Sequence, residues 1–492
     1  MAKFNQTNTI KTVNRSGCPA YRMKPAEELT AAVLTTMLGE PKYYGSTDKQ
    51  IVKLATRCAA QDPDYLCRLA AYARNTGNLR SVSHVLTAVI AREAREFTRI
   101  AVRNVVVRPD DITEIMSCYA AMYGKPFPNA MKREVADVIQ KFDEYQLAKC
   151  PAQNQALKLR DVLRITHPTP KDEATAALFR KVLDDTLEIP YTWETELSAK
   201  GNTRQVWDEL IASGKVGYMA LLRNLRNIVT VGADVQPVLA ILSDPERVRK
   251  SRQLPFRFYS AYRTLKGAGV MTPDIRRALE AALSASVDNM ETLPGRTLLA
   301  IDNSGSMGSA VSKQSTVLCC EIAALLGAMA NRICEDATVL QFDCAGFWGS
   351  TPEGYKVSHY GKFDSILDIC ERSAACGGGT DLALPLKYAL EVDPTRDVRP
   401  YDRIIYFSDN ECNSSYHGMA LTVQGLADQY RTQYNKNCWV HGVDLQGYGT
   451  QQFCGDRFNL IAGWNESVLD FIRMAEKGLG GMVTTIADYP LK

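Results

Sequence analysis

The chain has 492 residues, of which 46% are hydrophobic and 23% are charged, a composition typical of globular proteins that excludes a disordered, collagen-like or coiled-coil chain. This length predicts more than one domain. No segment approaches the roughly 20 consecutive apolar residues of a membrane span, and the amino-terminal part lacks the apolar core of a signal peptide, so we expect a cytoplasmic protein with no membrane partner.

The net charge of +3 conceals an asymmetry between the two halves of the chain. Residues 1–290 contain 42 Lys and Arg against 31 Asp and Glu, a charge of +11, whereas residues 291–492 contain 16 against 24, a charge of −8. A basic half joined to an acidic half suggests two domains, of which the first binds an anionic partner.

Apolar residues recur at three- and four-residue spacing through the first half, which predicts a helical domain over residues 1–290. Helices are expected at residues 25–38, 48–60, 63–75, 80–92, 110–122, 129–148, 158–165, 203–213, 216–229, 235–242, 245–251 and 272–287. No alternating strand pattern appears before residue 296. Helix pairs of about 40 residues favour a solenoid of the HEAT type. A helical bundle is the alternative, because no sequence repeat is evident.

Short apolar strands alternate with helices in the second half, which predicts a doubly wound α/β domain over residues 296–492. Strands are expected at residues 296–301, 337–342, 403–407 and 438–443. Helices are expected at residues 310–331, 363–371, 381–390, 419–430 and 466–477. In such a fold, ligands bind at the carboxyl ends of the parallel strands.

Oxygen-bearing side chains follow the strands and a glycine turn of this second domain. They are Asp302, Ser304, Ser306, Thr380 and Asp409. Because these ligands are hard and only two are carboxylates, the set suits a divalent cation such as Mg²⁺ that keeps positive charge for a partner's carboxylate or phosphate. The alternative is that Asp302 and Ser304 only cap the turn that follows them.

Three motifs of the second half resemble a von Willebrand factor A domain with its metal-ion-dependent adhesion site. They are residues 299–307 (LAIDNSGSM), 378–381 (GGTD) and 407–411 (FSDNE). Three segments of the first half resemble the TROVE module, namely residues 79–84 (LRSVSH), 219–227 (MALLRNLRN) and 254–263 (LPFRFYSAYR). This combination is similar to the Ro autoantigen family, and the short start and compact loops resemble a bacterial or phage-borne member.

The resemblance implies an α-helical HEAT-like repeat ring, the TROVE part, followed by the A domain. It also implies an RNA-binding function in non-coding RNA quality control or processing. The outer surface would bind a small structured, Y-like RNA, and the basic central hole would bind single-stranded 3′ ends of misfolded non-coding RNA. Such RNA would also tether the ring to an exoribonuclease.

The resemblance also assigns RNA contacts. The family's Y RNA surface matches residues 143–168, where Lys149 and His167 align with basic contact residues. A further basic residue of the family has no counterpart, and Lys158 and Arg160 are candidates to replace it. The remaining candidates are Arg164, Arg80 and His84.

Other roles are open for several of these residues. His167 precedes Pro168 and is also a candidate helix-end residue, and the arginines of residues 68–84 are candidates for a merely solvated helix face. Arg223 and Arg226 are candidates for packing between repeats.

Two other functions compete with RNA binding. One is a protein-interaction scaffold that recruits an acidic protein ligand through the metal of the A domain. The other is a metal-dependent hydrolase, which is disfavoured because no nucleophile–base pair or dense carboxylate cluster is evident. We therefore expect no enzymatic activity.

Overall fold

The computed structural model describes residues 11–13, 19–34, 46–149, 156–288, 290–310, 317–347, 349–412, 423–446, 450–463, 467–478 and 481–492. Contacts divide the chain into two compact units. The first, here called the helical unit, comprises Lys24–Tyr191 and Val483–Lys492. The second, here called the mixed unit, comprises Met1–Met23 and Thr192–Met482. Packing therefore groups the helices after residue 191 with the α/β part, whereas the sequence motifs place the change near residue 290.

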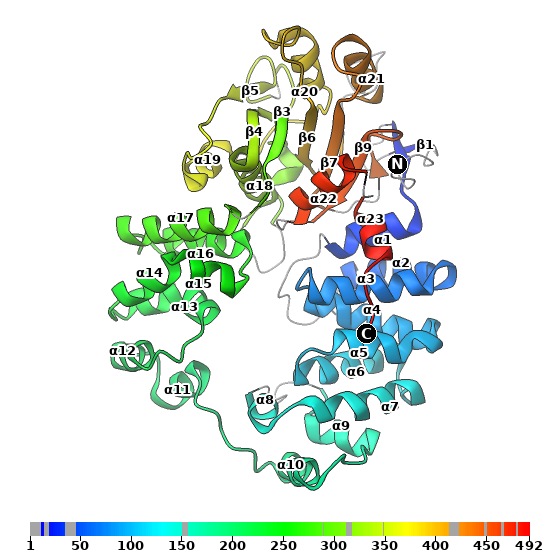
Figure 1. Cartoon of the computed structure of the whole chain (residues 1–492), viewed down its shortest axis with the longest axis vertical. Coiled ribbons are helices and arrows are strands. Elements are labelled where there is room, and N and C mark those ends of the chain that lie inside the picture. Colours follow the sequence, from blue (N-terminus) through cyan, green and yellow to red (C-terminus); the bar gives the residue numbers. More distant parts are fainter. Residues whose placement is uncertain are drawn as a thin grey trace. The chain divides into compact units, whose positions relative to one another are not determined.

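The helical unit consists of helices that follow one another along the chain (Figure 1). They are α1 (Pro25–Leu34), α2 (Ser46–Gln61), α3 (Pro63–Asn75), α4 (Arg80–Glu93), α5 (Thr98–Val105), α6 (Pro109–Tyr123), α7 (Asn129–Val138), α8 (Glu144–Lys149), α9 (Leu159–Thr166) and α10 (Glu173–Asp184). Local signals explain the starts: Asp62 caps α3 by accepting from the backbone N–H of Tyr65 at 2.9 Å, and Pro63 follows it. The helix expected over residues 129–148 divides, because Phe142 is extended.

Within the mixed unit, residues 192–288 form seven further helices. They are α11 (Trp193–Lys200), α12 (Arg204–Ala212), α13 (Tyr218–Thr230), α14 (Gln236–Ser243), α15 (Pro245–Ser251), α16 (Pro255–Gly267) and α17 (Pro273–Val287). The helical character expected for the first half is confirmed. The sequence did not predict α5, α10, α11 and α16 as helices. Among the residues described, no helix is long and apolar enough to cross a membrane.

A six-stranded sheet lies at the centre of the α/β part, with strand order β5-β4-β3-β6-β7-β9. The strands are β3 (Leu293–Asp302), β4 (Cys334–Phe342), β5 (Tyr355–Ser358), β6 (Arg403–Ser408), β7 (Trp439–Asp444) and β9 (Phe458–Ala462). All neighbours are parallel except β4 and β5. The predicted α/β fold and its four strands are confirmed, and β5 and β9 are additional.

Helices accompany this sheet (Figure 1). They are α18 (Cys319–Ile333), α19 (Ile366–Ser373), α20 (Leu384–Lys387), α21 (Val423–Gln433) and α22 (Ser467–Glu476). The last helix, α23 (Met482–Ala487), belongs to the helical unit except for its first residue. Helix α18 starts later than expected, after a bridge between Ala310 and Leu318. It packs closely on β3, because a Cβ atom at Gly327 would lie 2.6 Å from the Ile301 side chain.

A second, small sheet corrects the expectation that no strand precedes residue 296. Strand β2 (Pro19–Arg22) pairs antiparallel with both β1 (Lys11–Val13) and β8 (Thr450–Gln451). The amino-terminal segment is therefore part of the mixed unit, together with a segment that follows β7.

Helix α19 is joined to the preceding helices by a carboxylate. Glu280 of α17 accepts hydrogen bonds from the Ser365 hydroxyl at 2.8 Å and from the backbone N–H groups of Ile366 and Leu367 at 2.9 and 3.0 Å. These are N–H groups of the first turn of α19, which lack partners within their own helix. Glu280 thus completes the start of α19 from outside this helix and fixes α17 against the α/β part.

Buried hydrogen bonds to the Glu476 carboxylate connect β7, β6 and α22. The Nε2 atom of His441 lies 3.1 Å from Glu476 Oε1, and Arg403 donates to the same carboxylate at 2.6 and 2.9 Å. Burial alone would raise the pKa of Glu476, but the hydrogen bonds from His441 and Arg403 lower this pKa to about 2. Glu476 is therefore ionised wherever the protein is folded near neutral pH.

Residues 483–492 belong to the helical unit. Arg68 of α3 donates to the carbonyl oxygen of Tyr489 at 2.6 Å, and the rings of Tyr72 and Tyr489 meet edge to face with centroids 5.5 Å apart. Asn104 of α5 contacts both the backbone N–H of Lys492, at 3.0 Å, and its carbonyl oxygen, at 3.2 Å. Residues 483–492 are thus held on α3 and α5 by side chains of these helices that bond to the backbone of the segment.

Candidate functional site

The carboxyl ends of β3 and β6 lie side by side at the point where the strand order reverses. From β3 the chain first adds β4 and β5 on one side, and then β6, β7 and β9 on the other. Asp302 ends β3, and Ser408 ends β6 just before Asp409. Side chains at this topological switch point are positioned to bind a ligand in a doubly wound sheet.

Hydrogen bonds order the turn that follows β3. Asp302 Oδ1 accepts from the backbone N–H of Ser304 at 2.8 Å, and Asp302 Oδ2 accepts from the Ser408 hydroxyl at 2.5 Å. The hydroxyl oxygens of Ser304 and Ser306 lie 3.2 Å apart. The turn-capping role that was the alternative for Asp302 is present, and the same carboxylate also reaches the neighbouring strand.

The glycine turn that carries Thr380 lies against this loop. Gly305 N–H donates to Gly378 O at 3.0 Å, and Gly377 N–H donates to Asn303 O at 2.8 Å. A side chain at Gly305 would crowd this approach, since its Cβ would lie 3.1 Å from Gly378 O. The two loops bearing four of the five predicted ligands are therefore held together, and Asp409 follows the adjacent strand.

The electrostatics of this edge favour a cation. Asp302, Ser304 and Asp409 are fully buried, and Thr380 is nearly so. Burial, followed by the nearby charge of Asp409, raises the pKa of Asp302 to about 7. Two carboxylates that repel each other in a buried position, with hydroxyl oxygens beside them, fit a divalent cation that would offset the repulsion. In the described part of the chain no three His, Cys, Asp or Glu side chains gather as a metal site, so hydroxyl ligands would be required.

The candidate RNA contacts of residues 143–168 lie on and after α8 and α9. Lys149 is exposed at the end of α8, with its Nζ atom 3.2 Å from the Tyr145 hydroxyl. Lys158 and Arg160 are partly exposed at the start of α9, and Arg164 and His167 are exposed at its end. His167 is also the residue that ends α9, in the left-handed conformation with φ 46°. Its backbone therefore closes the helix while its imidazole faces solvent.

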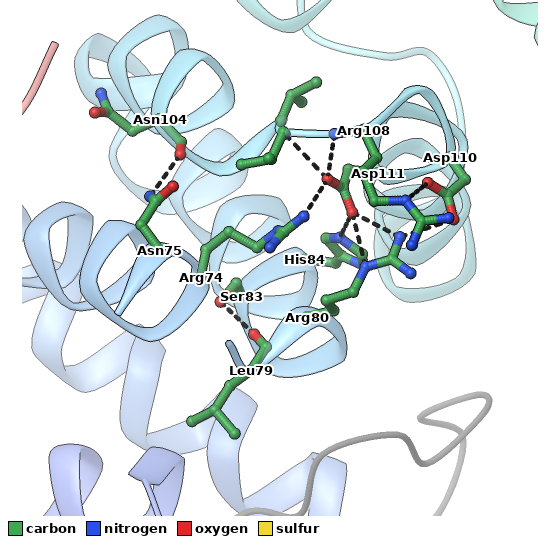
Figure 2. Close-up of polar contacts among 12 residues, drawn as sticks. Arg74, Asn75, Leu79, Arg80, Ser83, His84, Asn104, Arg108, Asp110 and Asp111 are labelled. Atoms are coloured by element: carbon green, nitrogen blue, oxygen red, sulfur yellow. Dashed lines mark hydrogen bonds and ion pairs between the residues drawn. The ribbon is translucent and has the colours of Figure 1, made fainter. Parts of the chain in front are cut away.

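Arg80 and His84 occupy a different environment, centred on Asp111 (Figure 2). Arg74 lies 2.8 Å from Asp111 Oδ2, and Arg80 and His84 lie 2.8 and 2.9 Å from Asp111 Oδ1. The backbone N–H groups of Val107 and Arg108 also donate to Oδ2, at 3.0 and 2.8 Å. Asp111 itself is fully buried near the start of α6.

This cluster changes the interpretation of the two residues. Burial alone would raise the pKa of Asp111, but its hydrogen bond with His84 and the charges around it hold this pKa well below the usual range. The sequence predicts His84 as an RNA contact, but its side chain is only 4% exposed and is bound to Asp111. It therefore holds α4 to α6 and presents little surface to RNA. Arg80 is 35% exposed and divides its guanidinium between Asp110 and Asp111.

Sequence reasoning missed two residues of these sites. Ser408 binds Asp302 directly, and its position between a buried strand and Asp409 was the available signal. Asp111 contacts three basic side chains. In the sequence, the only feature that marks Asp111 is a Pro-Asp-Asp segment typical of a helix start. No local pattern indicates that Arg74, Arg80 and His84 converge on it.

Comparisons with known proteins are consistent with this organisation. The TROVE domain model matches residues 29–188 and 185–270, and the Ro60 vWA domain model matches residues 296–473. Telomerase protein component 1 of Rattus norvegicus is 26% identical over 307 residues, which are 44% of this chain and 12% of that protein. RNA-binding protein RO60 of Caenorhabditis elegans is 29% identical over 227 residues, which are 43% of this chain and 32% of that protein.

The chain thus spans about a third or less of the length of these curated relatives. The crystal structure of the Deinococcus radiodurans RO (RSR) protein superposes with a TM-score of 0.62 and 20% identity, over 92% of this chain and all of that one. At this level of identity the likeness concerns the fold.

Proposed function

Because the chain belongs to the Ro family, whose members combine a TROVE domain with a von Willebrand factor A domain, we propose that it binds RNA. The proposed ligand of α8 and α9 is a small structured, Y-like RNA, contacted through its phosphates. We also propose that single-stranded 3′ ends of misfolded RNA bind elsewhere on the TROVE domain, that the protein acts in RNA quality control in the cytoplasm, and that it has no enzymatic activity.

One observation supports the α8–α9 surface above others. This segment carries five basic residues, which form no ion pair with a carboxylate of the described residues. They are Lys149, Lys158, Arg160, Arg164 and His167. By contrast, the nearby Lys181 is neutralised by Glu144 at 2.7 Å. Exposed cations without carboxylate partners suit the phosphates of a folded RNA, which proteins contact largely through the backbone.

The experiment is a salt series of RNA binding with the variant Lys149→Ala/His167→Ala. Loss of one phosphate contact lowers the slope of log affinity against log salt by about 0.9 for a duplex. The matched control is Lys181→Ala, since that charge is already paired. If the double variant keeps both its affinity and its salt slope, this surface is not the RNA site.

A second candidate function rests on the edge formed by β3 and β6. We propose that Asp302, Ser304, Ser306, Thr380 and Asp409 hold a divalent cation such as Mg²⁺, which would supply an open coordination position for an acidic group of a protein partner. The buried Asp302 and Asp409 carboxylates support this proposal. The variant Asp302→Ala should lose Mg²⁺-dependent thermal stabilisation and keep RNA binding. Loss of RNA binding by a folded Asp302→Ala protein would contradict the separation of the two sites.

A further inference from the structure

An exposed cysteine lies in the glycine turn beside the candidate metal edge. The chain contains 14 cysteines, and those that the structure describes are free thiols. Among these described thiols, Cys376 is the exposed one, and it lies four residues before Thr380 in the same turn. Cys320, in the first turn of α18, is buried with 2% of its surface exposed. The sites described above use neither residue.

The Cys376 side chain packs on a glycine of the loop after β3. Gly308 ends the short 3-10 helix Gly305–Gly308 that follows the predicted serine ligands of this loop. A Cβ atom on Gly308 would lie 3.2 Å from Cys376 Sγ and 3.6 Å from Cys376 Cβ. The thiol of Cys376 therefore lies over the space that the missing side chain of Gly308 leaves open.

Cys320 reaches the same glycine from the other direction. The backbone N–H of Cys319 donates to Ser309 O at 3.0 Å, and an antiparallel bridge in the same register precedes this contact. In an antiparallel register, one step forward on one segment is one step back on the other. Cys320 consequently comes opposite Gly308, and both cysteines adjoin this one residue.

The two thiols are chemically unequal. Burial, followed by the neighbouring Cys376 thiol with its hydrogen bond, raises the pKa of Cys320 to about 12. Cys320 is therefore a protonated thiol near neutral pH, and Cys376 is the thiol that a dissolved oxidant reaches first. An accessible cysteine beside a second cysteine that can resolve its oxidised form is the arrangement found in thiol redox sensors.

We propose that Cys320 and Cys376 form a reversible disulfide that controls the candidate cation site. With hydrogen peroxide as the oxidant, the Cys376 sulfur takes one oxygen as the O–O bond breaks, which gives a sulfenic acid and one water. The Cys320 sulfur then attacks the sulfenic sulfur and forms the S–S bond, while its proton leaves with the hydroxyl group as a second water. Two thiols thus lose two electrons and the peroxide gains them. A small thiol reverses the step by thiol–disulfide exchange.

The disulfide moves the turn that carries Thr380. An S–S bond is about 2.05 Å long, shorter than a non-bonded contact between two thiols, so Cys376 must approach α18. The same turn is held on the serine loop by the hydrogen bond from Gly305 N–H to Gly378 O at 3.0 Å. Because Mg²⁺ demands near-octahedral ligands at about 2.0–2.1 Å, oxidation should weaken cation binding. This consequence rests on the proposed cation site, whereas formation of the disulfide does not.

The test treats the full chain with hydrogen peroxide, alkylates the remaining thiols, and maps tryptic peptides by mass spectrometry. We expect residues 314–332 and 373–387 to be linked, and dithiothreitol to release them. The first peptide contains both Cys319 and Cys320, so Cys320→Ser should abolish the link and the matched control Cys319→Ser should keep it. Cys376→Ser, a change at an exposed position, should also abolish the link without affecting the fold.

Two outcomes would refute the pair. In one, Cys376 is oxidised to a sulfinic acid or is alkylated, and no linked peptide forms at any peroxide concentration. In the other, the linked peptide persists in Cys320→Ser, which would show that another cysteine is the partner of Cys376.

Cation binding supplies a second measurement. The rise of the melting temperature with Mg²⁺ concentration is compared for the reduced and the oxidised protein, and for Cys376→Ser after the same treatment. Oxidation should weaken Mg²⁺ binding roughly tenfold or more in the unaltered protein and leave Cys376→Ser unchanged. Equal Mg²⁺ affinity of the reduced and the fully linked protein would overturn the control of the cation site. If the reduced protein binds no Mg²⁺, the proposed cation site fails, and the linked peptides still decide the disulfide.

Discussion

Replacement of Asp111 by Asn tests the charge cluster that joins α3, α4 and α6. Asn retains the shape of the side chain but removes the charge that neutralises Arg74, Arg80 and His84. Its amide nitrogen would also face donors that now bind the carboxylate, including the backbone N–H groups of Val107 and Arg108. Breaking a buried ion pair from one side costs about 3–5 kcal/mol. For a unit of this size, the melting temperature should fall by roughly 6–20 °C.

The assay is hydrogen exchange on the full chain, combined with thermal unfolding followed by circular dichroism. Exchange should accelerate in α3, α4 and α6 and stay unchanged in the sheet of the mixed unit. The matched control is Asp110→Asn, whose side chain is more exposed and which should cost about 1 kcal/mol or less. A loss below about 1 kcal/mol for Asp111→Asn, with unchanged exchange in α4, would refute the reasoning.

The pH dependence of the same cluster has a definite sign. The pKa of Asp111 is lowered in the folded protein, so its contribution is fully present above its ordinary value, near 3.8. This contribution to the free energy of unfolding is lost as the pH falls below that value, because Asp111 is then protonated in the unfolded chain but still ionised in the folded chain. The Asp111→Asn variant should therefore lose less stability on acidification than the unaltered protein.

Two further predictions concern the sheet. Glu476→Gln should cost about 3 kcal/mol at neutral pH, because the folded pKa of about 2 lies below the ordinary value of 4.5; urea unfolding should show this loss vanishing as the pH falls from 4.5 towards 2. Gly327→Ala should cost about 1–3 kcal/mol, because its Cβ would lie 2.6 Å from Ile301. The control for Gly327→Ala is Gly267→Ala, because a Cβ atom at Gly267 would meet nothing within 4 Å. Equal melting temperatures of the two variants would contradict the steric argument.

The features that the sequence predicted well share a physical cause. Parallel strands covered on both faces are continuous apolar runs, so β3, β4, β6 and β7 were evident, and the polar residues after β3 and β6 had to meet at one edge. Strands β5 and β9 lie at the sheet edges and are short. Their apolar runs are therefore weak, and the sequence did not predict them. The His84 environment was not predictable, because its partner Asp111 lies 27 residues away on another helix.

The exchange of end segments between the two units constrains the order in which the protein can be completed during synthesis. The helical unit uses residues 483–492, held by Arg68 and Asn104, yet these residues leave the ribosome only after the whole α/β part. While the mixed unit is being synthesised, α3 and α5 therefore lack residues 483–492, and the face that this segment covers stays exposed. A nascent chain arrested before residue 483 would retain its entire sheet and still expose that face to chaperones and proteases.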